Sequence, residues 1–342
     1  MAWLRTMGDA RTTSDSERLA APLATAPLDG LAGGWYLAPA FEPTAAPDAA
    51  SRSAMTGTPR ADASPPQPKA IAPGRNERAA YQAFWSGVGA EFPSLKGAAS
   101  TDYYAECERR LMAELFPDLR GKRLFKTDLW DEAKNTEILA WAAERGARVA
   151  GCDIAVATVG QARTLLARHR PSLAAGDVRH VPFADATFDL LYSMGTIEHF
   201  PEYREALTEC FRVLKPGGRA IIGVPNKLDP FLRPALVAVL NSLGRYDYGV
   251  EKSFTAGGLR RLLEGAGFRV LASSGILFMP GWLRMADLWL HTRGSRLRRL
   301  TGALTQPFAA LYRRVPAVRR HGYLIALLAE KPLDAAPAAS TP

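Results

Sequence analysis

The chain has 342 residues, of which 47% are apolar, enough for one large domain or two small ones with a buried core. Its three cysteines, Cys107, Cys152 and Cys210, lie far apart with no C-x-x-C pair, which argues against a disulfide framework and against a zinc site. No secretory signal sequence and no apolar run of about 18 residues is evident, so we expect a cytoplasmic protein without a spanning helix.

The net charge of +9 is concentrated in one segment. Residues 282–320 carry nine arginines and a single acid, Asp287, which leaves the rest of the chain nearly neutral. Aromatic and aliphatic side chains alternate with these arginines, a composition that suits an anionic membrane surface. A plain helical cover packed on the protein body is the alternative. Nucleic acid is a weaker third option, because no recognised binding module accompanies the segment.

The N-terminal part of the chain divides into two regions. Residues 1–72 are rich in Ala, Pro, Ser and Thr without a sustained period, which predicts a disordered segment. Two helices are expected within 73–120, over 76–91 and 101–116, and we expect them to cover a site in the domain that follows. The last residues, 333–342, form a second segment that we expect to be disordered.

Strands and helices alternate between residues 121 and 332. We expect strands at 123–129, 147–154, 174–181, 188–194, 220–224, 268–277 and 323–330. The helices between them run from a cap at Asn135 to Gly146, over 156–169 and 201–214, and from a cap at Thr255 to Gly267, with a basic helical pair in 282–320. This alternation predicts right-handed crossovers and a parallel sheet with helices on both faces, and a ligand site beyond the carboxyl ends of its strands.

The most informative stretch is residues 174–226. An apolar run ends at Gly176-Asp177, and Phe188-Asp189 opens the next one. An amphipathic helix follows, and Leu214-Lys-Pro-Gly-Gly218 then turns into a further strand. This order resembles the second half of the class I S-adenosylmethionine-dependent methyltransferases, of the type that acts on small molecules and lipids.

The resemblance covers about residues 100–330 and implies a fold, a cofactor and an acceptor. The implied fold is α/β, with a doubly wound, mostly parallel seven-stranded sheet whose last strand is antiparallel. N-terminal helices precede the sheet, and a helical insert precedes its last strand. The implied cofactor is S-adenosyl-L-methionine, and the implied partner is a small-molecule or lipid acceptor. The acceptor pocket would be built by the N-terminal helices, residues 227–254 and the basic insert.

Two strand-end acids are the first candidate cofactor ligands. Asp153 ends a strand, where a carboxylate can accept hydrogen bonds from both ribose hydroxyls of a nucleotide-like cofactor. The resemblance assigns it that role and places Ile154 beside it. It also assigns Asp177 and the backbone N–H of Val178 to the adenine edge. A solvated acid or helix cap at Asp153, and a turn aspartate at Asp177, are the structural alternatives.

Residues at the end of the fourth expected strand, and just beyond it, are the next candidates. The resemblance places Ser193, Met194 and Gly195 beside the sulfonium, and a strand-end glycine lets a ligand approach the backbone. Glu198 and His199 follow. His199 is a candidate general base for an acceptor hydroxyl or acidic carbon, with Glu198 beside it, although both residues can serve to begin a helix instead.

The first motif departs from the family pattern. The family has an acid followed by a Gly-x-Gly-x-Gly loop, whereas here the strand runs into Asp128-Leu-Trp-Asp-Glu-Ala133 with no glycine. Asp128, Asp131 and Glu132 are then candidates to meet the cofactor's ammonium or sulfonium. A degraded site with an acidic surface turn is the alternative. The lost glycines also keep a non-catalytic cofactor-binding protein open, and the absent G-x-G-x-x-G disfavours a nicotinamide-dependent oxidoreductase.

Overall fold

A computed structural model of the chain describes residues 75–116, 118–243, 246 and 251–334. The segment 1–72 and residues 335–342 lie outside these ranges, so disorder there stays a prediction. Within the described ranges the domain boundaries near 73, 121 and 332 also stay predictions, because the helices and the sheet pack into one unit.

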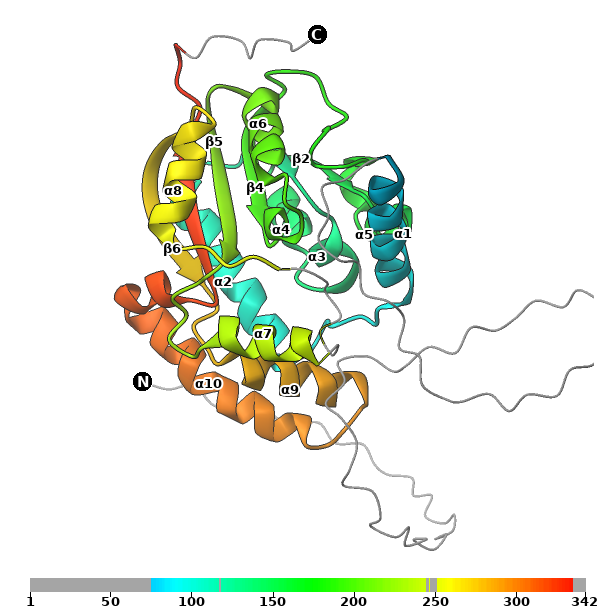
Figure 1. Cartoon of the computed structure of the whole chain (residues 1–342), viewed down its shortest axis with the longest axis vertical. Coiled ribbons are helices and arrows are strands. Elements are labelled where there is room, and N and C mark those ends of the chain that lie inside the picture. Colours follow the sequence, from blue (N-terminus) through cyan, green and yellow to red (C-terminus); the bar gives the residue numbers. More distant parts are fainter. Residues whose placement is uncertain (1–74, 117, 244–245, 247–250, 335–342) are drawn as a thin grey trace, which may run out of the picture. The chain divides into compact units, whose positions relative to one another are not determined.

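The described residues form one seven-stranded sheet with the order β3-β2-β1-β4-β5-β7-β6 (Figure 1). Its strands are β1 (Arg123–Lys126), β2 (Arg148–Asp153), β3 (Ser172–Ala175), β4 (Phe188–Met194), β5 (Leu214–Pro225), β6 (Arg269–Ile276) and β7 (Leu324–Glu330). Strands β1 to β5 are parallel, and β7 runs antiparallel to both β5 and β6. The predicted doubly wound sheet with an antiparallel last strand is confirmed.

Ten α-helices surround this sheet in the described part of the chain. They are α1 (Arg75–Glu91), α2 (Ala99–Leu115), α3 (Trp130–Lys134), α4 (Ile138–Glu144), α5 (Val156–Leu165), α6 (Tyr203–Val213), α7 (Arg233–Ser242), α8 (Ala256–Gly265), α9 (Gly281–Thr292) and α10 (Arg298–Arg314). Neighbouring strand residues enter different apolar clusters: Leu190 lies in the cluster with α2, α4 and α10, and Leu191 in the cluster with α6 and α8. This alternation is the period of two that a sheet covered on both faces requires.

Three local predictions are corrected by the structure. The third strand is Ser172–Ala175 and not 174–181, because the chain turns at Asp177, whose carbonyl accepts from the His180 N–H at 2.8 Å. The strand expected over 123–129 ends at Lys126, where the acidic loop begins. Asn135 does not cap α4: it follows α3, and its side-chain amide donates to Asp131 at 2.8 Å. The cap at Thr255 is confirmed, since its hydroxyl accepts from the Gly258 N–H at 3.0 Å.

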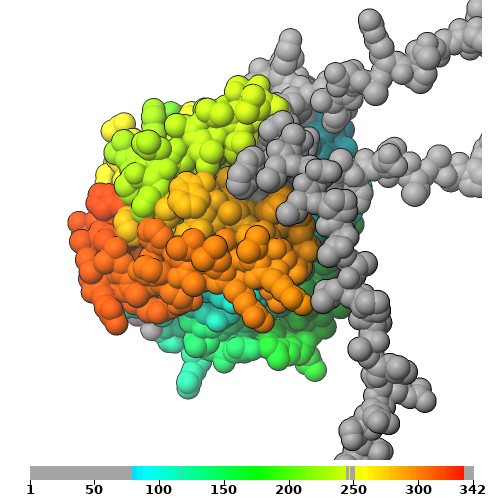
Figure 2. All heavy atoms as spheres, turned by 90° about the horizontal axis from the view of Figure 1, so that it is seen from below, coloured from blue at the N-terminus to red at the C-terminus, as the bar shows by residue number. Residues whose placement is uncertain are grey.

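The basic segment 282–320 is a helical pair, as predicted, between β6 and β7. Its helices α9 and α10 pack against each other, and α9 also packs against α7. The three helices lie beyond the carboxyl end of β5 (Figure 1) and share one face of the molecule (Figure 2). None of the helices in the described part of the chain has the length and apolarity needed to cross a membrane.

Candidate active site

A cavity of about 240 Å³ lies at the carboxyl ends of the parallel strands. The strand order reverses there between β1 and β4, which is where doubly wound sheets bind ligands. The cavity brings together most of the candidates named from the sequence, which are Asp128, Asp131, Asp153, Ile154, Asp177, Val178, Met194, Gly195, Glu198 and His199. Two candidates, Glu132 and Ser193, do not line it.

Asp153 is held at the cavity wall by two backbone donors. Its Oδ2 accepts from the Leu129 N–H at 2.9 Å and its Oδ1 from the Ala155 N–H at 2.8 Å. Burial raises the pKa of Asp153 to about 6, against the lowering effect of these two hydrogen bonds. Since a carboxylate has about four acceptor positions, both oxygens retain capacity for ligand hydroxyls. The two backbone N–H groups therefore hold the Asp153 carboxylate in place and leave it able to accept hydrogen bonds from a ligand.

Asp177 is paired with an arginine that the sequence analysis did not single out. The guanidinium of Arg179 donates to both carboxylate oxygens of Asp177, at 2.6–3.0 Å, and to Glu202 at 2.8 Å. Burial works to raise the pKa of Asp177, but the hydrogen bonds from Arg179 hold it below its usual value. Arg179 also lies over the rings of Tyr81 and Phe200. Asp177 is thus fixed as an ionised acceptor at the cavity wall.

The residues at the end of β4 differ in their position: Ser193 is buried below the cavity wall, and the next two residues line the cavity. Ser193 is fully buried, and its Oγ accepts from the Thr127 hydroxyl at 2.8 Å, which ties the ends of β1 and β4 together. Met194 and Gly195 line the cavity. Gly195 has φ +76°, a left-handed conformation that favours glycine, and a Cβ built there would lie 3.5 Å from the Glu198 carboxylate. The glycine keeps the backbone open to the cavity.

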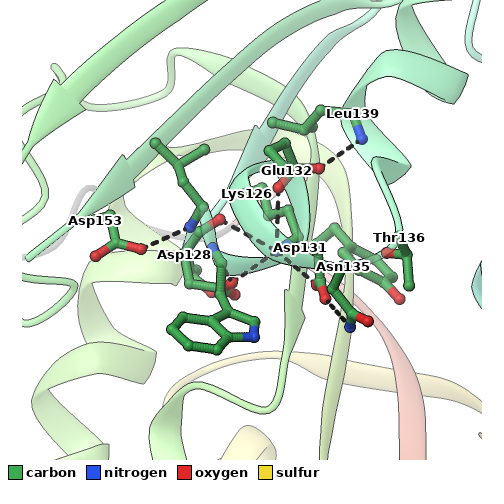
Figure 3. Close-up of polar contacts among 12 residues, drawn as sticks. Lys126, Asp128, Asp131, Glu132, Asn135, Thr136, Leu139 and Asp153 are labelled. Carbon is green, nitrogen blue, oxygen red and sulfur yellow. Dashed lines mark hydrogen bonds and ion pairs between the residues drawn. The ribbon is translucent and has the colours of Figure 1, made fainter. Parts of the chain in front are cut away.

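The loop after β1 is organised around one buried cation, Lys126 (Figure 3). The Lys126 ammonium lies 2.8 Å from Asp128, 3.0 Å from Asp131 and 3.6 Å from Glu132. Burial lowers the pKa of Lys126, but these carboxylates outweigh it and hold the pKa well above its usual value. Glu132 faces away from the cavity, where it accepts from the Leu139 N–H at 2.8 Å and anchors α4.

A fourth carboxylate, Glu108, belongs to the same buried network. It accepts from the Tyr192 hydroxyl at 2.7 Å and from the Thr136 hydroxyl. Burial raises the pKa of Glu108 well above its usual value and that of Glu132 to about 7. Asp128 and Asp131 remain at the cavity wall. Of the four acids around Lys126, only Asp128 and Asp131 line the cavity, so the wall offers two carboxylates against one buried ammonium, which suits a cationic ligand.

A glycine on the neighbouring strand accommodates this glycine-free loop. Leu129 is fully buried, and its Cδ2 lies only 2.6 Å from where a Cβ on Gly151 would stand. Any larger residue at 151 would force the Leu129 side chain to move. The loop is therefore a packed alternative to the family pattern and not a degraded surface turn.

Glu198 and His199 lie side by side at the cavity. The His199 Nε2 is 4.0 Å from a Glu198 oxygen, and the His199 ring packs edge-on against Trp85 with 5.0 Å between ring centres. Burial, reinforced by the nearby Glu251 carboxylate, raises the pKa of Glu198 well above its usual value. Burial therefore favours the protonated form of Glu198, in which the carboxyl group can donate a hydrogen bond.

The remaining cavity wall is mostly apolar and comes from α7, α9, β7 and the residue that follows β6. It includes Leu236, Val237, Leu277, Met285, Leu288 and Leu324. The buried Arg233 is neutralised by a two-point pair with Glu251. The wall thus gives an apolar molecule room beside the acidic half.

Arg284 is a cavity residue that the sequence analysis assigned only to the basic segment. Its guanidinium lies over the ring of Tyr104 at 5.0 Å and donates to the Ser100 carbonyl at 3.1 Å. Among the described residues, no carboxylate forms an ion pair with it. No sequence signal distinguishes Arg284 from its eight neighbours, because only the packing of α9 turns it inward. Tyr104 lines the cavity, whereas the Tyr103 hydroxyl donates to backbone carbonyls outside it.

Comparison with known proteins agrees with this geometry. Residues 133–222 match the model of the Methyltransferase domain family. A protein of Mycolicibacterium smegmatis described as an S-adenosylmethionine-dependent methyltransferase is 32% identical over 43% of this chain and 52% of its own length. The demethylmenaquinone methyltransferase of Beutenbergia cavernae is 32% identical over 37% of this chain and 59% of its own length. The ubiquinone biosynthesis O-methyltransferase of Sinorhizobium fredii is 28% identical over 43% of this chain and 60% of its own length. The chain spans little more than half the length of these relatives.

Solved structures agree on the fold. A chain of the Haloferax volcanii complex that contains the Trm112 methyltransferase activator superposes with a TM-score of 0.50 at 17% identity, over 74% of this chain and 97% of that one. The described part of the chain is therefore a class I methyltransferase fold. Residues 133–222 match a methyltransferase domain, and the relative from Mycolicibacterium smegmatis is named as S-adenosylmethionine-dependent.

Proposed function

We propose that the protein is an S-adenosylmethionine-dependent methyltransferase that methylates an apolar small molecule or lipid. One observation carries the proposal: acids from the ends of β1, β2 and β3 line the same cavity as the apolar side chains of α7 and α9. The acidic half suits a cofactor with a sulfonium and an ammonium group. The apolar half suits an acceptor with little charge.

Different cavity residues would bind different parts of the cofactor. Asp153 and Ile154 would hold the ribose, and Asp177 with the Val178 N–H would hold the adenine edge. Asp128 would meet the ammonium together with Asp131, and Met194 and Gly195 would lie beside the sulfonium. Glu132 and Ser193 would act indirectly, as buried supports of the loop and of the strand ends.

We include Arg284 in the proposed cofactor site. Tyr104 lies near the charges of both Asp131 and Arg284, so this end of the cavity offers a negative and a positive group to one ligand. The amino-acid part of the cofactor carries both charges. Arg284 would accordingly bind its carboxylate, as a charge-assisted hydrogen bond of the strong kind.

The chain would promote the reaction mainly by positioning. When bound, the cofactor supplies a methyl group activated by a positively charged sulfur. Holding the acceptor atom in line with that group can be worth about 7–11 kcal/mol of barrier. His199 would take the proton from an acceptor hydroxyl or acidic carbon, with Glu198 beside it.

The acceptor class follows from the cavity and is consistent with the relatives. Two of them are named for demethylmenaquinone and for ubiquinone biosynthesis, and another for a sterol. We propose an acceptor that shares their apolar character, reached in the cytoplasm through peripheral contact of residues 282–320 with the inner face of a membrane.

A test of this function follows transfer of a labelled methyl group. The full chain is incubated with a trideuteromethyl form of the cofactor and a mixture of membrane lipids and quinones, and products are analysed by mass spectrometry. A product three mass units heavier than its unlabelled counterpart is expected, and it should be absent with Asp153→Ala. Cofactor binding without a labelled product would favour the second candidate, a non-catalytic binding protein, which the glycine-free loop after β1 keeps open.

A further inference from the structure

Exposed large apolar side chains gather on the three helices over the acceptor half of the cavity. Those on α7, α9 and α10 or at their ends are Leu232, Val239, Leu243, Trp282, Leu297, Leu300, Leu304, Leu311 and Val315. The helices lie side by side on one face (Figure 2), with α9 packed against both α7 and α10. Elsewhere in the described ranges such side chains are scattered over separate elements. Gathered exposure of this kind marks an interaction surface.

The pattern along α10 shows that its apolar exposure is a continuous stripe. Leu297, Leu300, Leu304, Leu311 and Val315 recur at helical spacing and are 38–62% exposed. A different row of side chains faces the protein body, namely Thr301, Thr305, Ala309 and Tyr312, all buried. A helix of a globular protein normally turns its leucine stripe inward, so this helix presents its apolar face to an outside partner.

The charge around this stripe selects the partner. Arg296, Arg298 and Arg299 are exposed at the start of α10, and Arg313 and Arg314 at its end. Only Arg313 of these forms an ion pair among the described residues, with Glu106 at 2.6 Å. The single acid of the segment, Asp287, is buried and bound to the Ser100 N–H and the Thr301 hydroxyl. Apart from the pair of Arg313 with Glu106, the described part of this face is thus apolar and cationic without compensating acids.

The same helices connect this face to the cavity. The inward sides of α7 and α9 carry cavity-lining residues, among them Leu236 and Val237 on α7 and Met285 and Leu288 on α9. Their outward sides carry Val239 and Trp282 on the exposed face. Only the thickness of these two helices separates the acceptor half of the cavity from the face.

We propose that the outward faces of α7, α9 and α10 form a docking surface for an anionic lipid bilayer, and that the acceptor enters the cavity past α7 and α9 from that bilayer. The leucine stripe would lie at the boundary between headgroups and acyl chains, and the arginines would contact anionic headgroups. Docking stands on the exposed face alone, whereas acceptor entry rests on the proposed function.

Co-sedimentation of the full chain with vesicles tests the docking. Binding is expected to vesicles that contain phosphatidylglycerol and to be at least tenfold weaker with pure phosphatidylcholine. The change of Arg296, Arg298 and Arg299 to Ser should weaken binding at least tenfold at low salt. The matched control changes three exposed arginines elsewhere, Arg148, Arg204 and Arg261, to Ser and should behave as the unchanged chain.

A second pair of variants isolates the apolar contribution. Leu300→Ser with Leu304→Ser should remove the binding that persists at 0.5 M salt, where the Debye length is only about 4 Å and the attraction between exposed charges is largely screened. Its control changes the exposed Leu165 and Leu333 to Ser. Equal binding to both vesicle types, or equal effects of test and control variants, would overturn the docking surface.

Two further measurements decide what a negative result means. If vesicles do not bind and Leu300→Ser with Leu304→Ser turns a dimer into a monomer in sedimentation velocity, the face is an interface between copies and the proposal is wrong. Preference for a DNA duplex over anionic vesicles would also overturn it. Calorimetry with S-adenosylhomocysteine on the same samples keeps the two questions apart, because cofactor binding does not depend on docking.

Discussion

Arg284 and Asp131 lie close to the same ring, that of Tyr104, and they carry opposite charges. If the two residues bind the carboxylate and the ammonium group of an amino acid, they raise the affinity only of ligands that contain an amino-acid part. We expect Arg284→Gln to weaken S-adenosylhomocysteine binding about tenfold or more and to leave 5′-methylthioadenosine, which lacks the amino-acid part, unchanged. Calorimetry with both ligands measures this.

The control for Arg284 is a neighbour on the same segment. Arg293 lies over Trp289 at 4.3 Å and does not line the cavity. Arg293→Gln should leave the affinity for both ligands unchanged. Equal weakening of both ligands by Arg284→Gln would instead assign the residue to packing of α9 over the cavity.

Asp153 makes cofactor affinity depend on pH. Burial raises its pKa to about 6 in the free protein, and a ligand whose hydroxyls donate to the carboxylate favours the ionised form. Affinity is then low where Asp153 is protonated and rises with pH, by up to about tenfold per unit below pH 6, before it levels off. Calorimetry at pH 5.5, 6.5 and 7.5 tests this, and a wild-type slope that persists in Asp153→Asn would contradict it.

His199 is expected to act on the acceptor and not on the cofactor. Removing a general base typically costs about 10²–10⁴-fold in rate. Once an acceptor is known, His199→Ala should lower kcat by about this range while the affinity for S-adenosylhomocysteine changes less than about twofold. Unchanged turnover, or weaker cofactor binding together with lost stability, would mean that His199 acts as a packing partner of Trp85.

The stability of the loop from Lys126 through α3 depends on one buried charge, the Lys126 ammonium. Removal of one partner of a buried ion pair typically costs about 3–5 kcal/mol, because uncompensated charge stays behind. We expect Lys126→Met to lower the free energy of unfolding by about this amount in urea titrations. The control Lys215→Met breaks a half-exposed pair with Asp189 and should cost less than about 1 kcal/mol. Similar losses of unfolding free energy in both variants would contradict a special role of Lys126 in stabilising the loop.

The sequence predicted most elements because their signals are local. Alternating apolar runs and the Thr255 cap depend on residues a few positions apart. The loop after β1 could not be predicted in this way, since its shape depends on Leu129 packing over Gly151, a residue on another strand. Asn135 was misassigned for a related reason: Asp131, itself turned toward Lys126, binds its amide.

In the folded molecule, the candidate cofactor ligands at the strand ends meet at one cavity because the sheet topology brings the carboxyl ends of β1 to β4 together. The sequence therefore predicted Asp128, Asp153, Asp177 and Gly195 as neighbours. It did not predict Arg179 or Arg284, whose roles arise from side-chain direction after folding. It also did not predict that α10 turns its leucines outward, since helical spacing alone does not say which face is covered.

We expect the whole chain to bind S-adenosylmethionine at these strand ends, and calorimetry of the full chain with S-adenosylhomocysteine is the decisive measurement. Saturable binding at one site is expected, with at least tenfold weaker binding by Asp153→Ala, because the ribose would lose its charged acceptor. Saturable binding of NADH with no heat from S-adenosylhomocysteine would contradict it.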